Sequence, residues 1–503
     1  MLLPQIPGAQ EEGVEFYRYR VKLHDEFAAF YTFDLTGNGM QDLIVVEIDR
    51  LQREPIMFVS VFLHTPDGFR RTASPTRMPS SLALAGVGNF VGGAGLVILI
   101  PHRVEIWLWR DGRFHGEDAA GLDVDSIFPV EAGEVRSEVD LLVDLNGDGL
   151  SEIVVPGFDG LRVIQQMPDG SLQGKGFLRV RPHTRFWNSL TYRAVIHDVP
   201  SLHYVDFDGN GWLDVVAFSD GQLYWYPMDE SYGMGERTPY LVQDFRPPKP
   251  FDPTEPWDPP LRLIKVADLN QDGVPDLVFS KNAPTDSVFT STSSTLIYYG
   301  VPNEEGTLDR FPADADQVFV SEGFTLPIMV DIDGDRRIDL VQVNVEVTFW
   351  NAIRALIARS VKAEAAYYLM GAKGRYPDEP VEMESYSVKF SLNRFGHQPI
   401  ATHGDLNGDG LPDLLLSADK EELGIHWGRK EIAWDSDYDE VLQEFLPIHQ
   451  KRLYVRDLNM DGRDDLILTY IRSDNRQMPE TVSTLIVLLS NFPAPQLESA
   501  ASR

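Results

Sequence analysis

A nine-residue loop whose side chains could bind a hard metal ion lies at residues 405–413. Oxygen-bearing side chains occupy its first, third, fifth and ninth positions, with glycine at the sixth: Asp405, Asn407, Asp409, Asp413 and Gly410. Calcium takes about six to eight oxygen ligands, and a glycine lets the chain reverse within so short a loop. The residue types and their spacing therefore predict a calcium site.

Six further loops repeat this spacing. Their ligand positions are Asp34, Thr36, Asn38 and Asp42; Asp144, Asn146, Asp148 and Glu152; Asp206, Asp208, Asn210 and Asp214; Asp268, Asn270, Asp272 and Asp276; Asp331, Asp333, Asp335 and Asp339; and Asp457, Asn459, Asp461 and Asp465. Thr36 offers a hydroxyl where an acid or amide is usual, and Arg336 replaces the loop glycine, so these two sites are expected to be the weakest. Residues Val87–Gly95 keep glycines but have no carboxylate, which predicts the same hairpin without a metal site.

An EF-hand is the first alternative for such loops. It requires an acid at the twelfth position and a helix after it. None of the twelfth residues is an acid: Val45, Val155, Ala217, Phe279, Gln342, Leu416 and Leu468. The short apolar runs that follow instead predict β-hairpins in which the loop is the turn.

The loops recur about every 50 to 75 residues, which indicates an internal repeat of one supersecondary unit. Each unit has room for four short strands, as in residues 202–226, where two apolar runs flank the acidic loop and a third follows Asp220-Gly221. Small antiparallel sheets bury their faces by radial stacking. The predicted fold is therefore all-β, an eight-bladed β-propeller of four-stranded antiparallel blades, with a seven-bladed ring as the alternative.

The repeated Asp-x-Asn-x-Asp-Gly-x-x-Asp loops between strands resemble the FG-GAP/VCBS calcium-binding propeller repeats of integrin α-subunit heads and bacterial secreted proteins. The resemblance covers residues 14–490 as a single propeller, with residues 1–13 as an N-terminal extension and 491–503 as a C-terminal tail. It implies one calcium ion in each acidic loop, up to seven in all. It also implies that Val14–Val21 supplies the missing fourth strand of the last blade.

Composition restricts the class of partner and the compartment. Asp and Glu number 77 against 44 Lys and Arg, a net charge of −33, which argues against binding nucleic acid or an anionic membrane surface. The chain has no cysteine, and no apolar stretch is long enough for direct membrane insertion. Its start lacks the pattern of a signal peptide. Because weak calcium sites fill only where calcium is abundant, we expect an extracytoplasmic protein whose signal sequence is absent from this chain.

Three segments interrupt the repeat and are candidates for ligand binding. The first, residues 179–197, concentrates cations and aromatic rings, including Arg181, His183, Arg185 and Trp187. The second is the proline-rich stretch 245–260 with Trp257, and the third is a helical insertion near 347–362 with Arg354. Arginine and aromatic faces suit an acidic glycan or a carboxylate-bearing peptide. Each segment has an alternative interpretation. The cations of the first could pair with acids on the protein's own surface, the second could be a rigid connection, and the third could pack on the ring.

No nucleophile elbow, phosphate loop, zinc-binding or dinucleotide fingerprint occurs. The leading hypothesis is therefore a non-catalytic, calcium-stabilised scaffold that binds a protein or glycan partner. The alternative is a polysaccharide lyase or hydrolase acting on an acidic polysaccharide, with candidate groups at His183, Arg185, Tyr192 and His197. The oligomeric state stays open.

Overall fold

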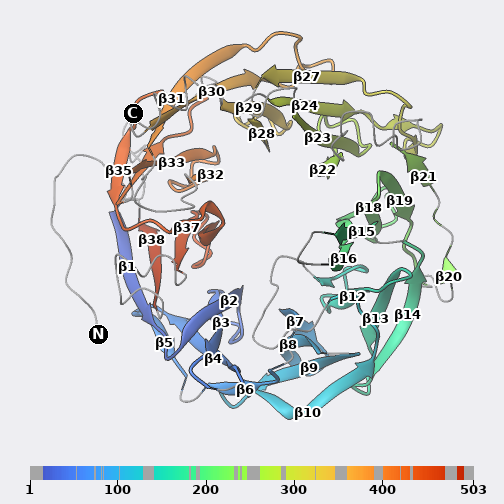
Figure 1. Cartoon of the computed structure of the whole chain (residues 1–503), viewed down its shortest axis with the longest axis vertical. Coiled ribbons are helices and arrows are strands. Elements are labelled where there is room, and N and C mark those ends of the chain that lie inside the picture. Colours follow the sequence, from blue (N-terminus) through green and yellow to red (C-terminus); the bar gives the residue numbers. More distant parts are fainter. Residues whose placement is uncertain are drawn as a thin grey trace, which may run out of the picture.

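The computed structural model describes residues 15–52, 54–72, 75–80, 82, 84–100, 102–128, 141–180, 183–188, 193–230, 236–237, 239, 241–245, 261–284, 291–322, 324–345, 360–389, 400–419, 421–430, 434–470 and 484–491. In these ranges it is almost entirely β-structure, with one 3-10 turn, η1 (Gln450–Arg452). Eight sheets stand around a common axis and close into a ring (Figure 1). The eight-bladed prediction is confirmed and the seven-bladed alternative is wrong.

The strands of the first four blades follow one another outward from the axis. Blade 1 is β2 (Glu26–Phe33), β3 (Asp42–Asp49), β4 (Ile56–Thr65) and β5 (Gly68–Arg71), with β6 (Thr76–Met78) also beside β4. Blade 2 is β7 (Leu84–Phe90), β8 (Gly93–Ile100), β9 (Arg103–Arg110) and β10 (Arg113–Asp123). Blade 3 is β11 (Leu142–Val143), β12 (Glu152–Pro156), β13 (Leu161–Gln166) and β14 (Leu172–Leu178), with β20 (Glu236–Arg237) at its edge. Blade 4 is β17 (Ser201–Val205), β18 (Asp214–Ser219), β19 (Gln222–Tyr226) and β21 (Leu241–Asp244).

The remaining blades repeat this order. Blade 5 is β22 (Arg262–Ala267), β23 (Asp276–Pro284), β24 (Ser291–Tyr298) and β27 (Gln317–Glu322). Blade 6 is β28 (Phe324–Val330), β29 (Asp339–Val345), β30 (Ser360–Tyr368) and β31 (Glu382–Lys389). Blade 7 is β32 (Ala401–Gly404), β33 (Asp413–Asp419), β34 (Glu422–His426) and β35 (Glu440–Gln443). Two separate hairpins are β15 (His183–Asn188) with β16 (Arg193–Asp198), and β25 (Val301–Pro302) with β26 (Leu308–Arg310).

Blade 8 joins the two ends of the described chain. It consists of β36 (Leu453–Arg456), β37 (Asp465–Thr469) and β38 (Thr484–Asn491), and β1 (Glu15–Lys22) is its outermost strand. All of β1 pairs with β38, from Glu15 opposite Asn491 to Lys22 opposite Thr484. The prediction that the N-terminal segment closes the ring is confirmed. Strand β38 includes Asn491, which the sequence analysis had placed in the tail.

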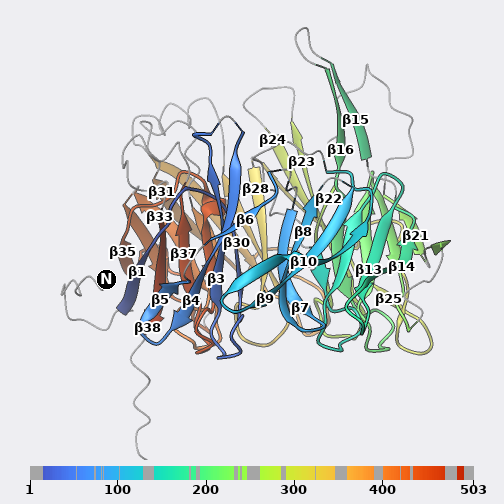
Figure 2. The same ribbon diagram turned by 90° about the horizontal axis from the view of Figure 1, so that it is seen from below.

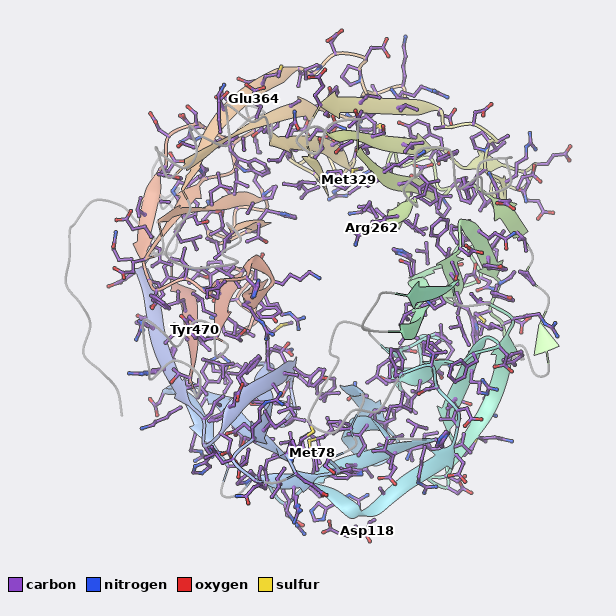
Figure 3. All side chains as sticks on the ribbon, in the orientation of Figure 1. Met78, Asp118, Arg262, Met329, Glu364 and Tyr470 are labelled. Carbon is purple, nitrogen blue, oxygen red and sulfur yellow. The ribbon has the colours of Figure 1, made fainter. Side chains whose placement is uncertain are left out.

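The core is divided among the blade junctions, with one cluster of buried apolar side chains at each of the eight. Alternate residues of a strand point to opposite faces, so each second strand serves two junctions. In β3, Ile44 and Val46 pack toward blade 2, whereas Leu43 and Val45 pack toward blade 8. Figure 3 shows the radial order, with Arg262 and Met329 on the inner strands and Asp118 and Glu364 toward the outer rim.

Strand order sets the two faces of the ring. Because successive strands are antiparallel, the turns after the first and third strands of each blade lie on one face. The turns after the second and fourth strands lie on the other. The acidic loops belong to the first face, which we call the loop face. The β15–β16 hairpin follows the fourth strand of blade 3, so it belongs to the opposite face, and Figure 2 shows it standing out from the ring.

Of the predicted helical insertion at 347–362, the structure describes only the last three residues. Residues 347–359 lie outside the described residues, whereas Ser360–Lys362 already belong to β30. The boundary at 362 is therefore wrong, because these residues pair with Lys389, Val388 and Ser387 of β31.

Candidate metal centres

All seven acidic loops join the first and second strands of a blade and share one hydrogen-bonded conformation. In blade 7, Oδ1 of Asp405 accepts the N–H groups of Gly408 (2.7 Å) and Asp409 (3.2 Å), and its Oδ2 accepts that of Gly410 (2.8 Å). The first aspartate of each other loop accepts the sixth N–H in the same way, as at Asp34, Asp144, Asp206, Asp268, Asp331 and Asp457. The loop is thus held around the carboxylate of its first residue by the protein's own backbone hydrogen bonds.

Two residues in each loop take positive φ, at the fourth and sixth positions. In blade 7 they are Gly408 (φ 74°) and Gly410 (φ 84°). The sequence analysis identified the sixth position and missed the fourth, although glycine recurs there in five of the seven loops: Gly37, Gly147, Gly209, Gly334 and Gly408. Gln271 (φ 62°) and Met460 (φ 57°) adopt the same conformation in the other two.

Arg336 keeps the turn although it is not a glycine. Its φ is 71°, and its N–H donates to Oδ2 of Asp331 at 2.7 Å, like the glycines it replaces. Its neighbour Arg337 forms an ion pair with Asp335, which occupies one of the predicted ligands. In blade 1, the Thr36 hydroxyl lies 3.4 Å from Oδ1 of Asp34. The prediction that these two loops bind calcium most weakly stays a prediction.

Arg336→Gly is expected to stabilise the protein by up to about 1 kcal/mol. A side chain in the left-handed region costs about 1 to 2 kcal/mol, and the greater freedom of glycine in the unfolded chain offsets about half of this. The reverse test is Gly410→Ala, whose added Cβ meets nothing within 4 Å, so the loss of about 1 kcal/mol comes from backbone strain alone. Urea unfolding in the presence of a chelator measures both variants. A destabilised Arg336→Gly protein would contradict this account.

The acid at the ninth position is a buried clamp. Asp413 accepts N–H groups from Leu406, at the second loop position, and from Gly428, just after the third strand, both at 2.8 Å. The same pair of backbone bonds is made by Asp42, Asp214, Asp276, Asp339 and Asp465. Glu152 accepts from Leu145 and from the Gln165 amide. All seven are at most 1% exposed. The sequence analysis gave this position only a metal-binding role, whereas it also ties the loop to the third strand.

Burial raises the pKa of the six clamp aspartates. The pKa is raised to about 6 for Asp42, Asp214 and Asp339 and to about 7 for Asp276, Asp413 and Asp465, chiefly because desolvation disfavours the charged form. The backbone N–H groups act in the opposite direction.

The donor set of the loops fits calcium. Every predicted side-chain ligand offers an oxygen, as a hard cation prefers. Within the described residues, three carboxylates approach to within 4.8 Å of one another in two loops, Asp206 with Asp208 and Asp214, and Asp331 with Asp333 and Asp335. In four other loops an asparagine amide at position three donates to the acid at position five, as Asn146 does to Asp148 at 2.9 Å. In the blade 4 and blade 6 loops the carboxylates therefore already lie close enough to share one cation, whereas in those four other loops the asparagine oxygen accepts a backbone N–H and would have to turn to reach an ion.

Without calcium, we expect a higher melting temperature at about pH 5 than at about pH 8. The folded pKa values of about 6 to 7 exceed the ordinary 3.8, so the folded state binds more protons between these limits. The stability that protonation gives is present at low pH and is lost as the pH rises through 6 to 7. Calorimetry with a chelator measures this, and the same series in excess calcium is the control, where the decline should disappear. A calcium-free melting temperature that rises with pH would refute it.

Neighbouring loops are also linked to one another. The N–H at the eighth position donates to a carbonyl of the preceding blade: Gln41 to Leu458 (2.7 Å), Leu213 to Leu145 (2.8 Å), Ile338 to Leu269 (2.9 Å), Asp464 to Asp405 (2.6 Å) and Ser151 to Asn89 (2.8 Å). In blades 5 and 7 the eighth residue is Pro275 or Pro412, which has no N–H to donate. The loop face thus carries five of these links. Prolines remove two others, and among the described residues no such bond joins blades 1 and 2.

Blade 2 has the expected hairpin. Strands β7 and β8 pair as far as Phe90 opposite Gly93, so only Val91 and Gly92 form the turn. This turn is much shorter than the nine-residue acidic loops, and the absence of a metal site at Val87–Gly95 stays a prediction.

The candidate ligand-binding residues fall into two groups. Arg181, Tyr192, Trp257 and Arg354 lie outside the described residues. His183, Arg185 and Trp187 occupy alternate positions of β15, opposite Asp198, Ile196 and Ala194 of β16, and His197 lies in β16. The cation-rich segment therefore contains a hairpin that leaves the ring on the face opposite the acidic loops (Figure 2).

In the part of the chain that is described, no helix has the length and apolar character needed to span a membrane.

One family model matches part of the chain, and several solved structures are similar to it. Residues 206–279, from the blade 4 loop to the second strand of blade 5, match the FG-GAP-like repeat family. No curated protein matches the chain in sequence. Similar solved structures include a lectin of Agrocybe aegerita, in a study of non-reducing terminal N-acetylglucosamine recognition, at 15% identity and TM-score 0.40, covering 76% of this chain and 87% of the lectin. Another is the V. cholerae biofilm matrix protein Bap1, at 13% identity and TM-score 0.39, covering 93% of this chain and 89% of Bap1. The repeat match and the ring of blades together support the resemblance to FG-GAP propellers.

Proposed function

We propose that this protein is a non-catalytic, calcium-stabilised propeller that binds a protein or glycan partner outside the cytoplasm. The observation that carries the proposal is the difference between the two faces of the ring. Seven loops with one shared acidic conformation lie on the loop face, and a hairpin with the cation-rich sequence rises from the other. Calcium in the loops would stiffen the ring, and the opposite face would present the partner site.

The proposed extracytoplasmic location rests on the proposed calcium sites. Loops of this modular kind fill only at calcium concentrations found outside cells, on the order of 10⁻³ M. Seven loops spread around one ring would make the stability of the whole protein depend on that supply.

The chemical class of partner follows from the hairpin sequence. The chain carries a net charge of −33, whereas the segment 183–197 holds two arginines and two histidines beside Phe186 and Trp187. A local excess of cations with aromatic rings suits an acidic glycan or a peptide carboxylate.

Binding to acidic polysaccharides should depend on the hairpin. We expect Arg185→Ala combined with Trp187→Ala to weaken binding to alginate, pectin and heparin at least tenfold, and added salt to weaken the wild-type interaction because exposed charges are screened over about 8 to 10 Å. Thr184→Ala with Asn188→Ala is the matched control on the same strand. Binding assays in calcium buffer measure the effect. Undiminished binding by the first variant would refute the hairpin as the site, and ultraviolet-absorbing unsaturated products would favour the lyase alternative.

A further inference from the structure

A groove lies on the outer flank of the ring where blades 2 and 3 meet, and it shares no lining residue with the acidic loops or the hairpin. Two adjoining hollows of about 560 and 420 Å³ share Asp123 and Val124, at the end of β10. The larger continues along β13 and β14 to Phe177, and the smaller reaches the blade 2 turn at His102. Each volume is in the range of small-molecule sites, about 300 to 1,000 Å³.

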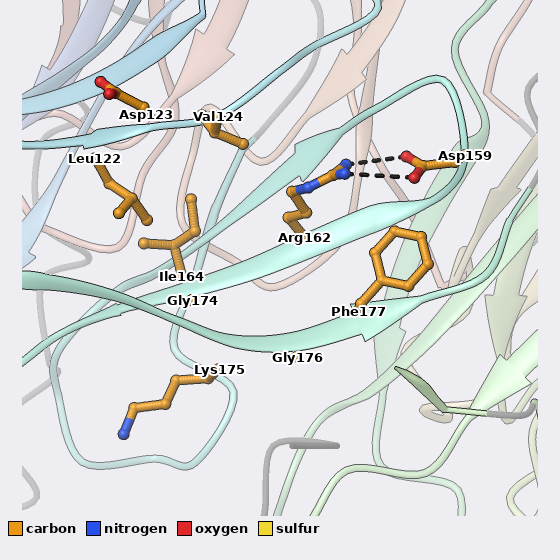
Figure 4. A pocket seen from close by; sticks show the side chains of 10 residues that line it. All are labelled: Leu122, Asp123, Val124, Asp159, Arg162, Ile164, Gly174, Lys175, Gly176 and Phe177. Carbon is orange, nitrogen blue, oxygen red and sulfur yellow. Dashed lines mark hydrogen bonds and ion pairs between the residues drawn. The ribbon is translucent and has the colours of Figure 1, made fainter. Parts of the chain in front are cut away.

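The floor of the groove is apolar and open. Val124 (6% exposed) and Ile164 (1% exposed) form its base, and the Phe177 ring lies beyond them (Figure 4). Strand β14 contributes Gly174 to the lining, and a Cβ added to Gly174 would meet nothing within 4 Å. The backbone is therefore bare at this point, and a ligand can lie directly against it.

All the charged groups that line the groove except Lys175 are already paired. Arg162 reaches both carboxylate oxygens of Asp159, at 3.1 and 3.4 Å, while its guanidinium lies 5.2 Å from the centre of the Phe177 ring (Figure 4). In the smaller hollow, Arg103 contacts Asp123 at 2.8 Å and Nδ1 of His102 lies 2.7 Å from Asp125. These pairs hold donors and acceptors in fixed positions without leaving a large net charge.

The charge balance discriminates between classes of ligand. Three lining acids, Asp123, Asp125 and Asp159, match three lining cations, Arg103, Arg162 and Lys175. An anionic ligand would need cations in excess, and a cationic ligand would need acids in excess. Lys175 pairs with no acid among the described residues, so one ammonium remains as a donor. The lining side chains therefore sum to no net formal charge in a chain of net charge −33, although Glu105, which does not line the groove, also contacts Arg103 at 3.0 Å; the lining itself does not select for charge.

We propose that this groove binds an uncharged oligosaccharide. A neutral sugar ring has an apolar C–H face, which matches Val124, Ile164 and Phe177, and hydroxyl edges that need donors and acceptors together. The Arg162–Asp159 pair supplies both, and Lys175 of β14 adds a donor. This proposal concerns a second site and does not depend on the anionic ligand assigned to the hairpin.

The test uses uncharged trisaccharides of glucose, mannose, galactose and N-acetylglucosamine, with full-length protein in calcium buffer. Calorimetry and saturation-transfer NMR are expected to show binding by at least one of them, unchanged between low and high salt. Gly174→Val should weaken that binding at least tenfold, because the new side chain projects into open space in the groove. Since valine favours strands, the melting temperature should not fall.

Two further variants complete the test. Gln173→Val changes the exposed neighbouring residue of the same strand, which does not line the groove, and should bind like the wild type. Phe177→Ala should weaken binding without shifting the salt dependence. The proposal is overturned if none of the trisaccharides binds or if Gly174→Val binds as well as Gln173→Val. The hairpin variant, Arg185→Ala with Trp187→Ala, should retain trisaccharide binding, so failure at one site is distinguishable from failure at the other.

Discussion

Deletion of residues 1–22 is expected to prevent formation of a stable closed ring. It removes β1, and with it every backbone hydrogen bond that β38 makes on that side. It also removes Val21 (4% exposed) from the junction of blades 8 and 1, and the Arg18 ion pair with Glu444. The loss should be about 5 kcal/mol or more, which is comparable with the whole stability of an ordinary domain.

The matched control is deletion of residues 1–14, which ends immediately before β1. It should leave the melting temperature nearly unchanged. Size-exclusion chromatography and circular dichroism compare the two proteins. A synthetic peptide of residues 15–22 added in excess should restore part of the melting temperature of the longer deletion. If the protein without residues 1–22 were monomeric and as stable as the control, β1 would not be what closes the ring.

Removal of calcium should have an effect of similar size. If each loop binds with a dissociation constant of ~0.1 mM and calcium is ~1 mM, each adds about 1.4 kcal/mol, so seven would add about 10 kcal/mol. Calorimetry with and without chelator measures the sum, and titration calorimetry measures the stoichiometry, which should not exceed seven. Asp405→Ala and Asp457→Ala should each remove one site.

Asn89→Ala, in the blade 2 hairpin, is the control for these substitutions. It should leave the calcium stoichiometry unchanged, because Asn89 contacts the neighbouring blade through its backbone carbonyl, which accepts the N–H of Ser151. A melting temperature that does not respond to chelation would show that the loops are folded by their own hydrogen bonds alone. Loss of one site in Asn89→Ala would show that the assignment of sites to blades is wrong.

The sequence predicted the features that are determined by residues close together in the chain. Seven loops with fixed spacing gave the number of blades and the position of each first and second strand, and the apolar run at Leu96–Ile100 gave blade 2. These signals are local because a loop such as 405–413 contains all its own turn-forming residues. The sequence analysis also assigned the cations of residues 179–197 to an insertion, but it did not predict the strand pairing of His183–Asp198.

Features that depend on distant residues were not predicted. The clamp from Asp413 to Gly428, and the link from Gln41 to Leu458, join backbone groups whose meeting is fixed only by the closed ring. The groove between β10 and β14 arises in the same way, since neither strand alone encodes a cavity. The helix boundary at Lys362 was wrong because strand pairing with β31 overrides the helical spacing of apolar residues.

The two loop prolines make the ring mechanically uneven. Pro275 removes the loop-to-loop hydrogen bond between blades 4 and 5, and Pro412 removes that between blades 6 and 7. Blades 5 and 6 remain joined through Ile338 and Leu269, so they form an arc bounded by two seams. Among the described residues the junction of blades 1 and 2 also has no such bond, so thermal fluctuation should concentrate at these three junctions, and amide protons beside them should exchange with solvent before those inside the arc. A propeller of this kind would deform mainly by rotation of rigid groups of blades about a few junctions, and not by equal small movements at all eight.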